Sequence, residues 1–264
     1  MRLEYKYLFP IEQLPAFKSA IAQYCNFDSY CEKRKQRYYT VRSIYLDSDR
    51  LGFYQEKTDG NKIRKKLRIR GYNEQNGLDQ VFLEIKRKYN NFISKDRALL
   101  QYRNLPALCA GRDIDRYIIE SNGNSQSTAS ARKFFYHVYK RSLKPVVLIT
   151  YERYAFYSKF NKQLRTTLDF NLKYRPFPGL EALFDENDLR SIMKQYGIFE
   201  IKFDRGLPHW FQTLSKDFNL TRLAFSKYTI CIDSDKKAFG FCEKRKAFIP
   251  RLNDQFTNSV KSND

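Results

Sequence analysis

The sequence predicts an α+β fold in which an antiparallel, eight-stranded β-barrel has helices packed on its outside. About eight runs of β-branched, aliphatic and aromatic residues are joined by short polar turns, and this pattern is typical of antiparallel strands. Most of these runs carry one or two charged side chains on one face and apolar side chains on the other. A closed barrel of this size has room for one small ligand, so the charged faces would line a water-filled interior. The apolar faces would then lie beneath the helices.

In the predicted strands, apolar and polar side chains alternate, whereas in the predicted helices apolar residues recur every three or four positions. The strands are predicted at residues 3–9, 39–46, 61–72, 81–88, 92–99, 146–157, 164–172 and 198–203. Helices are predicted at residues 11–24, 51–56, 131–142, 180–196 and 208–218. Charge, or Ser, Asn and Gly content, predicts loops at residues 32–37, 73–79 and 121–130. These elements form one predicted domain, residues 1–232, followed by a basic tail, residues 233–264.

Residues 61–72 are unusual because they combine strand-favouring residues with a dense row of cations. Alternation places four of the cations on one face, namely Arg64, Lys66, Arg68 and Arg70. The opposite face carries Ile63, Leu67 and Ile69. Like charges side by side repel unless an anion lies opposite them. A solvated surface strand is the alternative, but charged faces recur on other strands and favour anion binding. We expect Arg68 and Arg70 to point inward, with Arg64 and Lys66 nearer the mouth.

The composition predicts a soluble globular protein that binds a polyanion. Apolar residues make up 42% of the 264 residues, enough for a sizeable core, and the formal net charge is +20. Such a charge indicates a partner such as polyphosphate, a nucleotide, nucleic acid or an anionic membrane. A β-rich core explains the aromatic excess as well as base stacking does, so no nucleic acid is expected. No apolar run approaches the roughly 20 residues of a membrane span, although a membrane-protein partner stays open.

Several kinds of catalytic site are missing from the sequence. It contains neither a P-loop nor Gly-x-Gly-x-x-Gly, so no glycine loop cradles phosphates. His137 and His209, the only histidines, lie in predicted helices, which argues against a histidine-dependent triad or a zinc site. The five scattered cysteines form no Cys-x-x-Cys pair, which predicts reduced thiols in a cytoplasmic protein. Arg, Lys and a few strand carboxylates remain, an inventory that suits phosphoryl transfer.

Nine short motifs follow one another in the order of a known family. They are Glu4-Tyr-Lys6-Tyr, Tyr39-Thr-Val-Arg-Ser-Ile-Tyr-Leu-Asp47, Lys66-Leu-Arg68-Ile-Arg70, Leu83-Glu-Ile-Lys86, Ser94-Lys95-Asp-Arg97, Tyr151-Glu-Arg153, Arg165-Thr-Thr-Leu-Asp169, Phe199-Glu200-Ile-Lys202 and Phe225-Ser-Lys227-Tyr. Together they resemble the VTC domain, the polyphosphate polymerase domain of the vacuolar transporter chaperone type, within the triphosphate tunnel metalloenzymes. The resemblance covers residues 3 to about 230.

The resemblance implies a tunnel that binds a nucleoside triphosphate and polyphosphate together with a divalent metal, Mn or Mg. By position, it gives catalytic roles to Arg68, Arg70, Lys86, Arg153 and Arg165. It gives substrate contacts to Lys6, Lys95, Tyr151, Lys202 and Lys227. Glu200 would be the metal carboxylate, with Glu4 and Glu84 as further candidates.

The function implied by the resemblance is a metal-dependent polyphosphate polymerase, which transfers the γ-phosphate of ATP to a growing inorganic polyphosphate chain. A hydrolase of triphosphate or polyphosphate and a non-catalytic polyphosphate binder are the alternatives. Relatives that hydrolyse triphosphates or cyclise ATP carry Glu-x-Glu-x-Lys in the first strand, but here Arg2 stands in place of the first Glu. Two of the candidate metal carboxylates have a simpler alternative role. Glu84 could form an ion pair with Lys86, and Glu200 could form one with Lys202.

Overall fold

The computed structural model describes residues 3–73, 79–90, 92–111, 113–120, 126–204, 206–224 and 226–240. Its strands are β1 (Leu3–Pro10), β2 (Cys25–Phe27), β3 (Tyr39–Asp47), β4 (Ile63–Tyr72), β5 (Gln80–Tyr89), β6 (Phe92–Gln101), β7 (Ile118–Ile119), β8 (Lys144–Ser158), β9 (Arg165–Pro176), β10 (Arg190–Ser191), β11 (Tyr196–Phe203) and β12 (Thr221–Arg222). Its helices are α1 (Leu14–Ala22), α2 (Ser29–Glu32), α3 (Gly52–Thr58), α4 (Leu105–Gly111), α5 (Ile114–Tyr117), α6 (Gln126–Lys140), α7 (His209–Asp217) and α8 (Lys227–Ser234), with 3₁₀ helices η1 (Ile11–Gln13), η2 (Tyr102–Asn104) and η3 (Leu180–Phe184).

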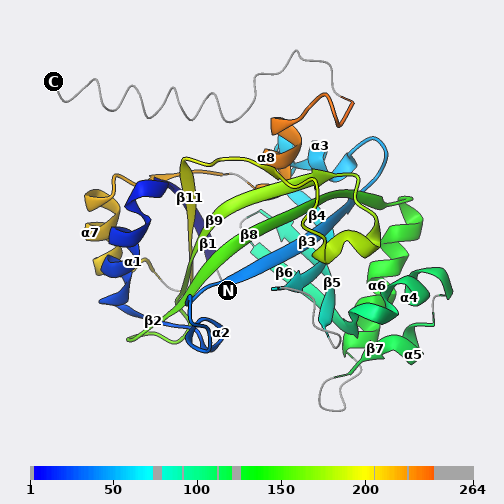
Figure 1. Cartoon of the computed structure of the whole chain (residues 1–264), viewed down its shortest axis with the longest axis horizontal. Helices are drawn as coiled ribbons and strands as arrows, with labels where there is room; N and C mark the ends of the chain where they lie inside the picture. The colour runs from blue at the N-terminus through cyan, green and yellow to red at the C-terminus, as the bar shows by residue number, and fades with distance from the viewer. Residues whose placement is uncertain are drawn as a thin grey trace.

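All twelve of these strands belong to one antiparallel sheet. Its main path runs β12-β1-β11-β9-β8-β3-β4-β5-β6-β7, while β10 pairs with β9 and β2 pairs with β8. Eight strands have at least eight residues, and the other four have two or three. The sheet arches over in Figure 1, from β1 and β11 on one side, through β9, β8 and β3, to β4, β5 and β6. The concave face of this arch carries the charged residues described below.

The predicted α+β class with an antiparallel sheet is confirmed, but the prediction of a closed, eight-stranded barrel is wrong. Within the described residues, the sheet path ends at the short strands β12 and β7, which do not pair with each other. β12 pairs with β1 only at Tyr7 and Leu8, and β7 pairs with β6 only at Leu99 and Leu100. Side-chain alternation detects long strands, so the four short strands escaped the prediction. Very short edge strands end a sheet rather than close it.

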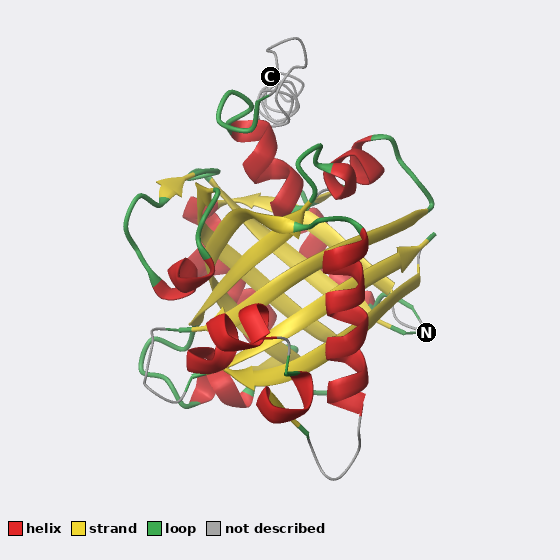
Figure 2. Ribbon diagram, turned by 90° about the vertical axis from the view of Figure 1, so that its right-hand side faces the viewer, coloured by secondary structure: helices red, strands yellow, loops and turns green. Residues whose placement is uncertain are grey.

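The convex face of the sheet is apolar and helices cover it. Leu67 and Ile69, from the predicted apolar face of β4, are buried in a cluster with Phe134 of α6. Figure 2 shows α6, the long helix at the front, lying across the strands. Ile63, at the start of β4, is the exposed exception. On the other arm of the arch, α1 and α7 pack around the buried ring of Phe199 in β11.

The helix predicted at residues 180–196 is wrong, because only η3 and the two-residue β10 form there. Asp188 and Met193 have φ angles of 55° and 52°, in the left-handed region that a right-handed helix excludes. Arg175 of β9 also donates hydrogen bonds to the carboxylate of Asp185 and to the carbonyl of Asn187. The acidic stretch is therefore held against the sheet instead of forming a helix.

α6 begins at Gln126, inside the predicted loop 121–130, so this part of the loop prediction is wrong. The carboxylate of Glu120 accepts hydrogen bonds from the backbone N–H groups of Ser127 and Thr128. A side chain that satisfies the free N–H groups of the first turn stabilises a helix start. The Ser- and Thr-rich composition concealed this start.

α8 forms near the end of the predicted domain, and the sequence analysis did not predict it. The Ser226 side chain caps the helix by accepting a hydrogen bond from the N–H of Thr229. Residues 74–78 of the predicted turn, 121–125 of the predicted loop and 241–264 of the predicted tail lie outside the described residues. The domain boundary at residue 232 stays a prediction.

Two whole-chain predictions can be compared with the structure. The four described cysteines, Cys25, Cys31, Cys109 and Cys231, form no disulfide with one another, whereas Cys242 lies outside the described residues. In the described part of the chain, no helix is long and apolar enough to cross a membrane.

Candidate anion-binding cavity

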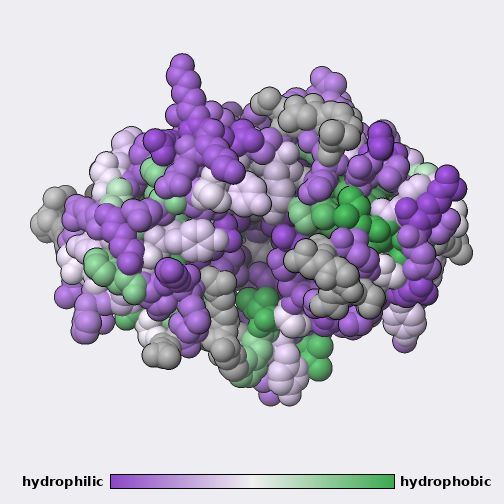
Figure 3. Space-filling model, turned by 90° about the horizontal axis from the view of Figure 1, so that it is seen from below, coloured by the Kyte–Doolittle hydropathy of each residue, from purple (hydrophilic) through white to green (hydrophobic). Residues whose placement is uncertain are grey.

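The concave side of the sheet holds a cavity of about 240 Å³. Ten of the thirteen predicted site residues line it, namely Glu4, Lys6, Arg68, Arg70, Lys86, Tyr151, Arg153, Glu200, Lys202 and Lys227. They come from β1, β4, β5, β8 and β11 and from the first residue of α8. Figure 3, which looks at the molecule from below the arch of Figure 1, shows a hollow near the centre with hydrophilic residues around much of it. The fold therefore brings most of the predicted set together.

The wall of the cavity is strongly cationic. Thirteen Lys or Arg side chains line it, against only two carboxylates. Six of these cations were missing from the predicted site, namely Lys57, Arg64, Lys65, Lys66, Lys88 and Arg222. Strand alternation had already placed Arg64 and Lys66 on the face of Arg68, near the mouth, and it could have added Lys88, which shares a face with Lys86. Lys57 and Arg222 come from α3 and from the two-residue β12, and no periodicity in the sequence places those elements at the cavity.

Glu84 lies behind the cavity wall and not in the lining, where a metal ligand would be expected. Its two carboxylate oxygens accept hydrogen bonds from Nε of Arg68 and Nε of Arg97, each at 2.7 Å. Burial by itself would raise the pKa of Glu84, but Arg68, Arg70 and Arg97 more than offset burial and hold the pKa far below its usual range. Glu84 is thus the internal counter-charge of these arginines, while Lys86 pairs with Glu4.

Asp169 is a second buried carboxylate that holds cavity cations, and the sequence analysis gave it no role. It accepts hydrogen bonds from Nε and Nη2 of Arg153 at 2.6 and 2.7 Å. The Nζ of Lys227 lies 2.5 Å from Oδ2 of the same carboxylate. The register of β8 and β9 places Asp169 directly opposite Arg153. Asp169 therefore orients two cations that line the cavity without lining it itself.

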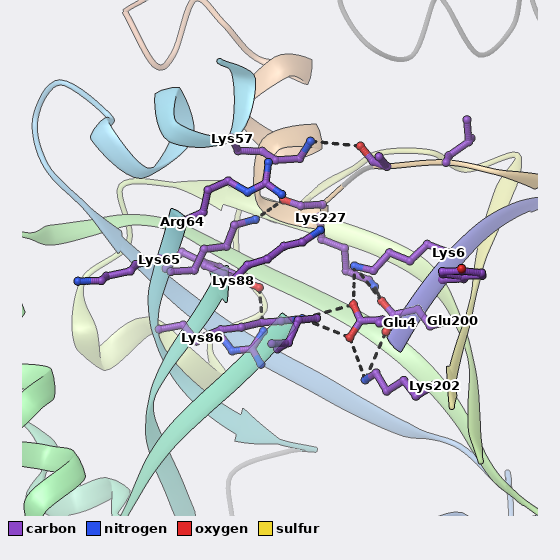
Figure 4. A pocket seen from close by; sticks show the side chains of 18 of the residues that line it. Glu4, Lys6, Lys57, Arg64, Lys65, Lys86, Lys88, Glu200, Lys202 and Lys227 are labelled. Atoms are coloured by element: carbon purple, nitrogen blue, oxygen red, sulfur yellow. Dashed lines mark hydrogen bonds and ion pairs between the residues drawn. The ribbon is translucent and has the colours of Figure 1, made fainter. Parts of the chain in front are cut away.

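Glu4 and Glu200 are the two carboxylates of the lining. In the β1–β11 pair, Glu4 lies opposite Lys202, and Lys6 lies opposite Glu200. Both lysines bridge both carboxylates, with N···O distances of 3.3 to 3.7 Å. Figure 4 shows these four side chains converging at one side of the cavity. Burial would raise the pKa of each carboxylate, but the surrounding cations more than offset burial, so both carboxylates stay ionised. The predicted alternative, a Glu200–Lys202 ion pair, is thus present.

Four lysines of the lining have lowered pKa values, namely Lys57, Lys66, Lys86 and Lys88. Lys66 donates a 2.6 Å hydrogen bond from Nζ to Oγ of Ser226. Burial, and then repulsion from Lys6 and other cations, holds the pKa of Lys66 well below 10.5. Burial also lowers the pKa of Lys86, to about 8, even though Glu4 acts in the opposite direction. A bound anion would favour the charged form of these lysines.

Two predicted cations lie outside the lining. Arg165 pairs with the buried Asp28, with 3.0 Å between Nη2 and Oδ2, and its guanidinium lies over the ring of Tyr157. Lys95 lies opposite Lys86 in the β5–β6 pair, but 45% of its side chain is exposed. Both residues are therefore absent from the cavity lining, although Nζ of Lys95 lies 3.8 Å from Glu84, the partner of Arg68.

A divalent metal fits the cavity only together with a phosphate ligand. The described residues contain no group of three or more His, Cys, Asp or Glu side chains that could hold a metal ion. Mg²⁺ is often bound through one or two carboxylates, with substrate phosphates and water as the remaining ligands. Glu4 and Glu200 fit this mode, because both line the cavity and both are ionised.

The fold and the cavity define an α+β protein whose antiparallel sheet encloses a strongly basic cavity on its concave side. The chain matches the VTC domain over residues 1–235, and it therefore belongs to the VTC domain family. This match confirms the resemblance found in the sequence motifs. A search of curated proteins finds no match.

Two solved structures resemble the chain over most of its length. The PH1819 protein from Pyrococcus horikoshii OT3 is 14% identical, with a TM-score of 0.45 over 89% of this chain and 99% of that chain. HpAC1 from Hippeastrum, described as having a dominant triphosphatase activity, is 12% identical, with a TM-score of 0.46 over 87% of this chain and 94% of that chain.

The substitution Asp169→Asn should destabilise the protein, because it removes the charge that compensates the buried cations of Arg153 and Lys227. Breaking a buried ion pair in this way costs about 3–5 kcal/mol, measured as the free energy of unfolding in urea. Inorganic triphosphate should recover part of this loss by supplying negative charge. Asp115→Asn, which removes the exposed partner of Arg132, is the control and should cost less than about 1 kcal/mol. Equal losses in the two variants would contradict the role of Asp169.

Affinity for polyphosphate should fall as the pH rises above neutrality, before the pH at which an ordinary lysine loses its proton. Lys66 has a lowered pKa, so it becomes neutral early as the pH rises and then attracts phosphate less strongly. The charge of the ligand is nearly constant in this range, because phosphate groups titrate near pH 6. Lys66→Arg keeps its charge and should flatten the pH dependence measured by calorimetry. Identical slopes for both proteins would show that Lys66 is not the titrating group.

Proposed function

We propose that the protein is a metal-dependent polyphosphate polymerase, which transfers the γ-phosphate of ATP to the end of an inorganic polyphosphate chain. The proposal depends on one observation, the excess of thirteen cations over two carboxylates in a cavity of about 240 Å³. Such a wall suits a substrate with negative charge on every unit. Membership of the VTC domain family supports the same class of substrate.

In the proposed reaction, cations from three elements neutralise the phosphoryl oxygens. Arg68 and Arg70 lie on β4, Arg153 on β8, and Lys227 at the start of α8. Because Glu84 orients Arg68, and Asp169 orients Arg153 and Lys227, these charges are in place before the substrate arrives. Preorganised charges of this kind stabilise a phosphoryl-transfer transition state without reorganisation.

The proposed transfer requires no general base from the protein. An oxygen of the terminal phosphate of the chain is already anionic and attacks the γ-phosphorus of ATP. The bond from this phosphorus to the β–γ bridging oxygen breaks, a new phosphoanhydride bond forms, and ADP leaves. Lys6, Lys86 and Lys202 would neutralise the chain on the side of the cavity formed by β1, β5 and β11.

Glu4 and Glu200 are the residues that would hold the divalent metal, Mn or Mg. When bound, the metal supplies additional positive charge to the phosphate oxygens. Lys6 and Lys202, which bridge the two carboxylates in the structure, would then be available to the phosphates. The proposal gives no direct contact to Lys95 or Arg165, because both lie outside the lining.

Hydrolysis of triphosphate or polyphosphate is the second candidate, and Lys66 is the observation that favours it. A hydrolase must remove a proton from the attacking water, and a lysine with a lowered pKa is a suitable general base. The first strand counts against this activity, because it lacks the first Glu of the Glu-x-Glu-x-Lys pattern. A non-catalytic binder would hold polyphosphate without consuming a nucleotide.

Incubation with ATP and Mn or Mg, followed by sizing of the product on a gel, tests the proposed function. We expect chain growth with release of ADP. Arg70→Ala and Glu200→Gln should stay folded and lose about 10²–10³-fold of the turnover, because the first removes a cation aimed at the phosphates and the second removes a carboxylate proposed to hold the metal. Arg132→Ala, an exposed arginine paired with Asp115, is the control and should retain full turnover.

Each alternative outcome has a distinct meaning. Phosphate release without chain growth would favour the hydrolase, and binding without ATP consumption would favour the binder. No chain growth under any metal or primer condition would overturn the polymerase. Full activity in both Arg70→Ala and Glu200→Gln would remove the cavity from the mechanism.

A further inference from the structure

The arch of the sheet is open along one line, which we call the seam. One border of the seam is residues 3–5 of β1, and the other is residues 92–98 of β6. Each segment pairs with a neighbouring strand on one side only, β11 for β1 and β5 for β6. No described strand pairs with the outer side of either segment, because β12 reaches only Tyr7 and Leu8, and β7 reaches only Leu99 and Leu100. Within the described residues, hydrogen bonds between strands therefore do not close the arch along the seam.

Among four cations of the cavity, the two near the seam have more exposed side chains than the two deeper in the arch. Lys86 of β5 and Lys202 of β11 lie on the two arms near the seam, and 34% and 28% of their side chains are exposed. Arg70 of β4 and Arg153 of β8 lie deeper in the arch, and only 8% and 11% of their side chains are exposed. All four side chains line the same cavity. Solvent therefore reaches the two cations near the seam more readily than the two that lie deeper in the arch.

A side-chain ion pair connects the two arms beside the seam. Nζ of Lys86 lies 3.3 Å from both carboxylate oxygens of Glu4. Figure 4 shows Lys86 extending from β5 across the cavity to Glu4 on β1. A polyanion that binds Lys86 can replace Glu4 as its partner, and this exchange opens the way through the seam.

We propose that a phosphate chain enters the cavity sideways through the seam, so that the site binds an internal segment of a long chain and requires no free end. This inference rests on the proposed function. The ligand class is a linear phosphate polyanion that is longer than the cavity. Charge on every unit lets any segment of the chain satisfy the cations equally well. A chain captured in this way then slides along the cavity until its end lies beside the γ-phosphate of ATP.

The test compares long linear polyphosphate with free ends, with one end blocked and with both ends blocked by coupling to biotin and streptavidin. Dissociation constants are measured at one fixed salt concentration, because polyanion affinity depends steeply on salt. We expect the chain blocked at both ends to bind within about threefold of the chain blocked at one end, less than the tenfold that corresponds to 1.4 kcal/mol. A loss of more than about tenfold on blocking the second end would overturn sideways access.

Variants of a cavity cation and of a surface cation distinguish binding in the cavity from binding at the outer surface. Arg70→Ala removes a deep cavity cation and should weaken the binding of all three chains in parallel, whereas Arg132→Ala on the outer surface should leave it unchanged. Arg70→Gln, which keeps more of the side-chain bulk, replaces Arg70→Ala if the latter unfolds. If the doubly blocked chain binds both Arg70 variants as well as wild type, it binds outside the cavity and the inference is wrong. If the chain with free ends does not bind at all, the proposed function fails together with the inference.

Discussion

Repulsion among the cations of one cavity is the constraint on which the rest of the structure depends. Two unit charges 4 Å apart interact with about 4 kcal/mol at the effective dielectric of a protein surface, and thirteen cations line this wall. Four carboxylates reduce the repulsion, namely Glu4, Glu84, Asp169 and Glu200, and each lies within ion-pair distance of at least two cations. Because the cations outnumber these carboxylates, the remaining excess is available to an anionic ligand.

The register of the antiparallel sheet reduces the repulsion among the cations, because it places carboxylates beside them. Each of the four carboxylates lies directly opposite a cation of the neighbouring strand. The pairs are Glu4 with Lys202, Glu200 with Lys6, Glu84 with Arg68, and Asp169 with Arg153. Opposite charges in such positions stabilise the pairing of the strands. The same four contacts aim the cations at the cavity, so the features that stabilise the sheet also prepare the site.

The parts of this arrangement that depend on one strand could be predicted from the sequence. Alternation along residues 61–72 placed Arg68 and Arg70 on one face and Leu67 and Ile69 on the other, and the structure has them so. This succeeds because the two-residue period of a strand is a local property.

The parts that depend on neighbouring strands could not be predicted. Glu84 lies behind the wall because Arg97 of β6 approaches it, and Asp169 acquires its role because β9 lies beside β8. Whether the sheet closes is decided at its edges by β7 and β12, which are too short to leave a periodic signal. The positive φ angle of Asp188, which prevents the predicted helix at residues 180–196, also has no signature in the hydrophobic pattern.

The structure of the protein with bound inorganic triphosphate would test most directly the central claim, that the concave face of the sheet binds a phosphate chain. The account predicts phosphate oxygens within hydrogen-bonding distance of Arg70, Arg153 and Lys227, with the Glu84–Arg68 and Asp169–Arg153 pairs intact. Triphosphate bound only on the outer surface of the protein, with the cavity free of phosphate, would contradict it.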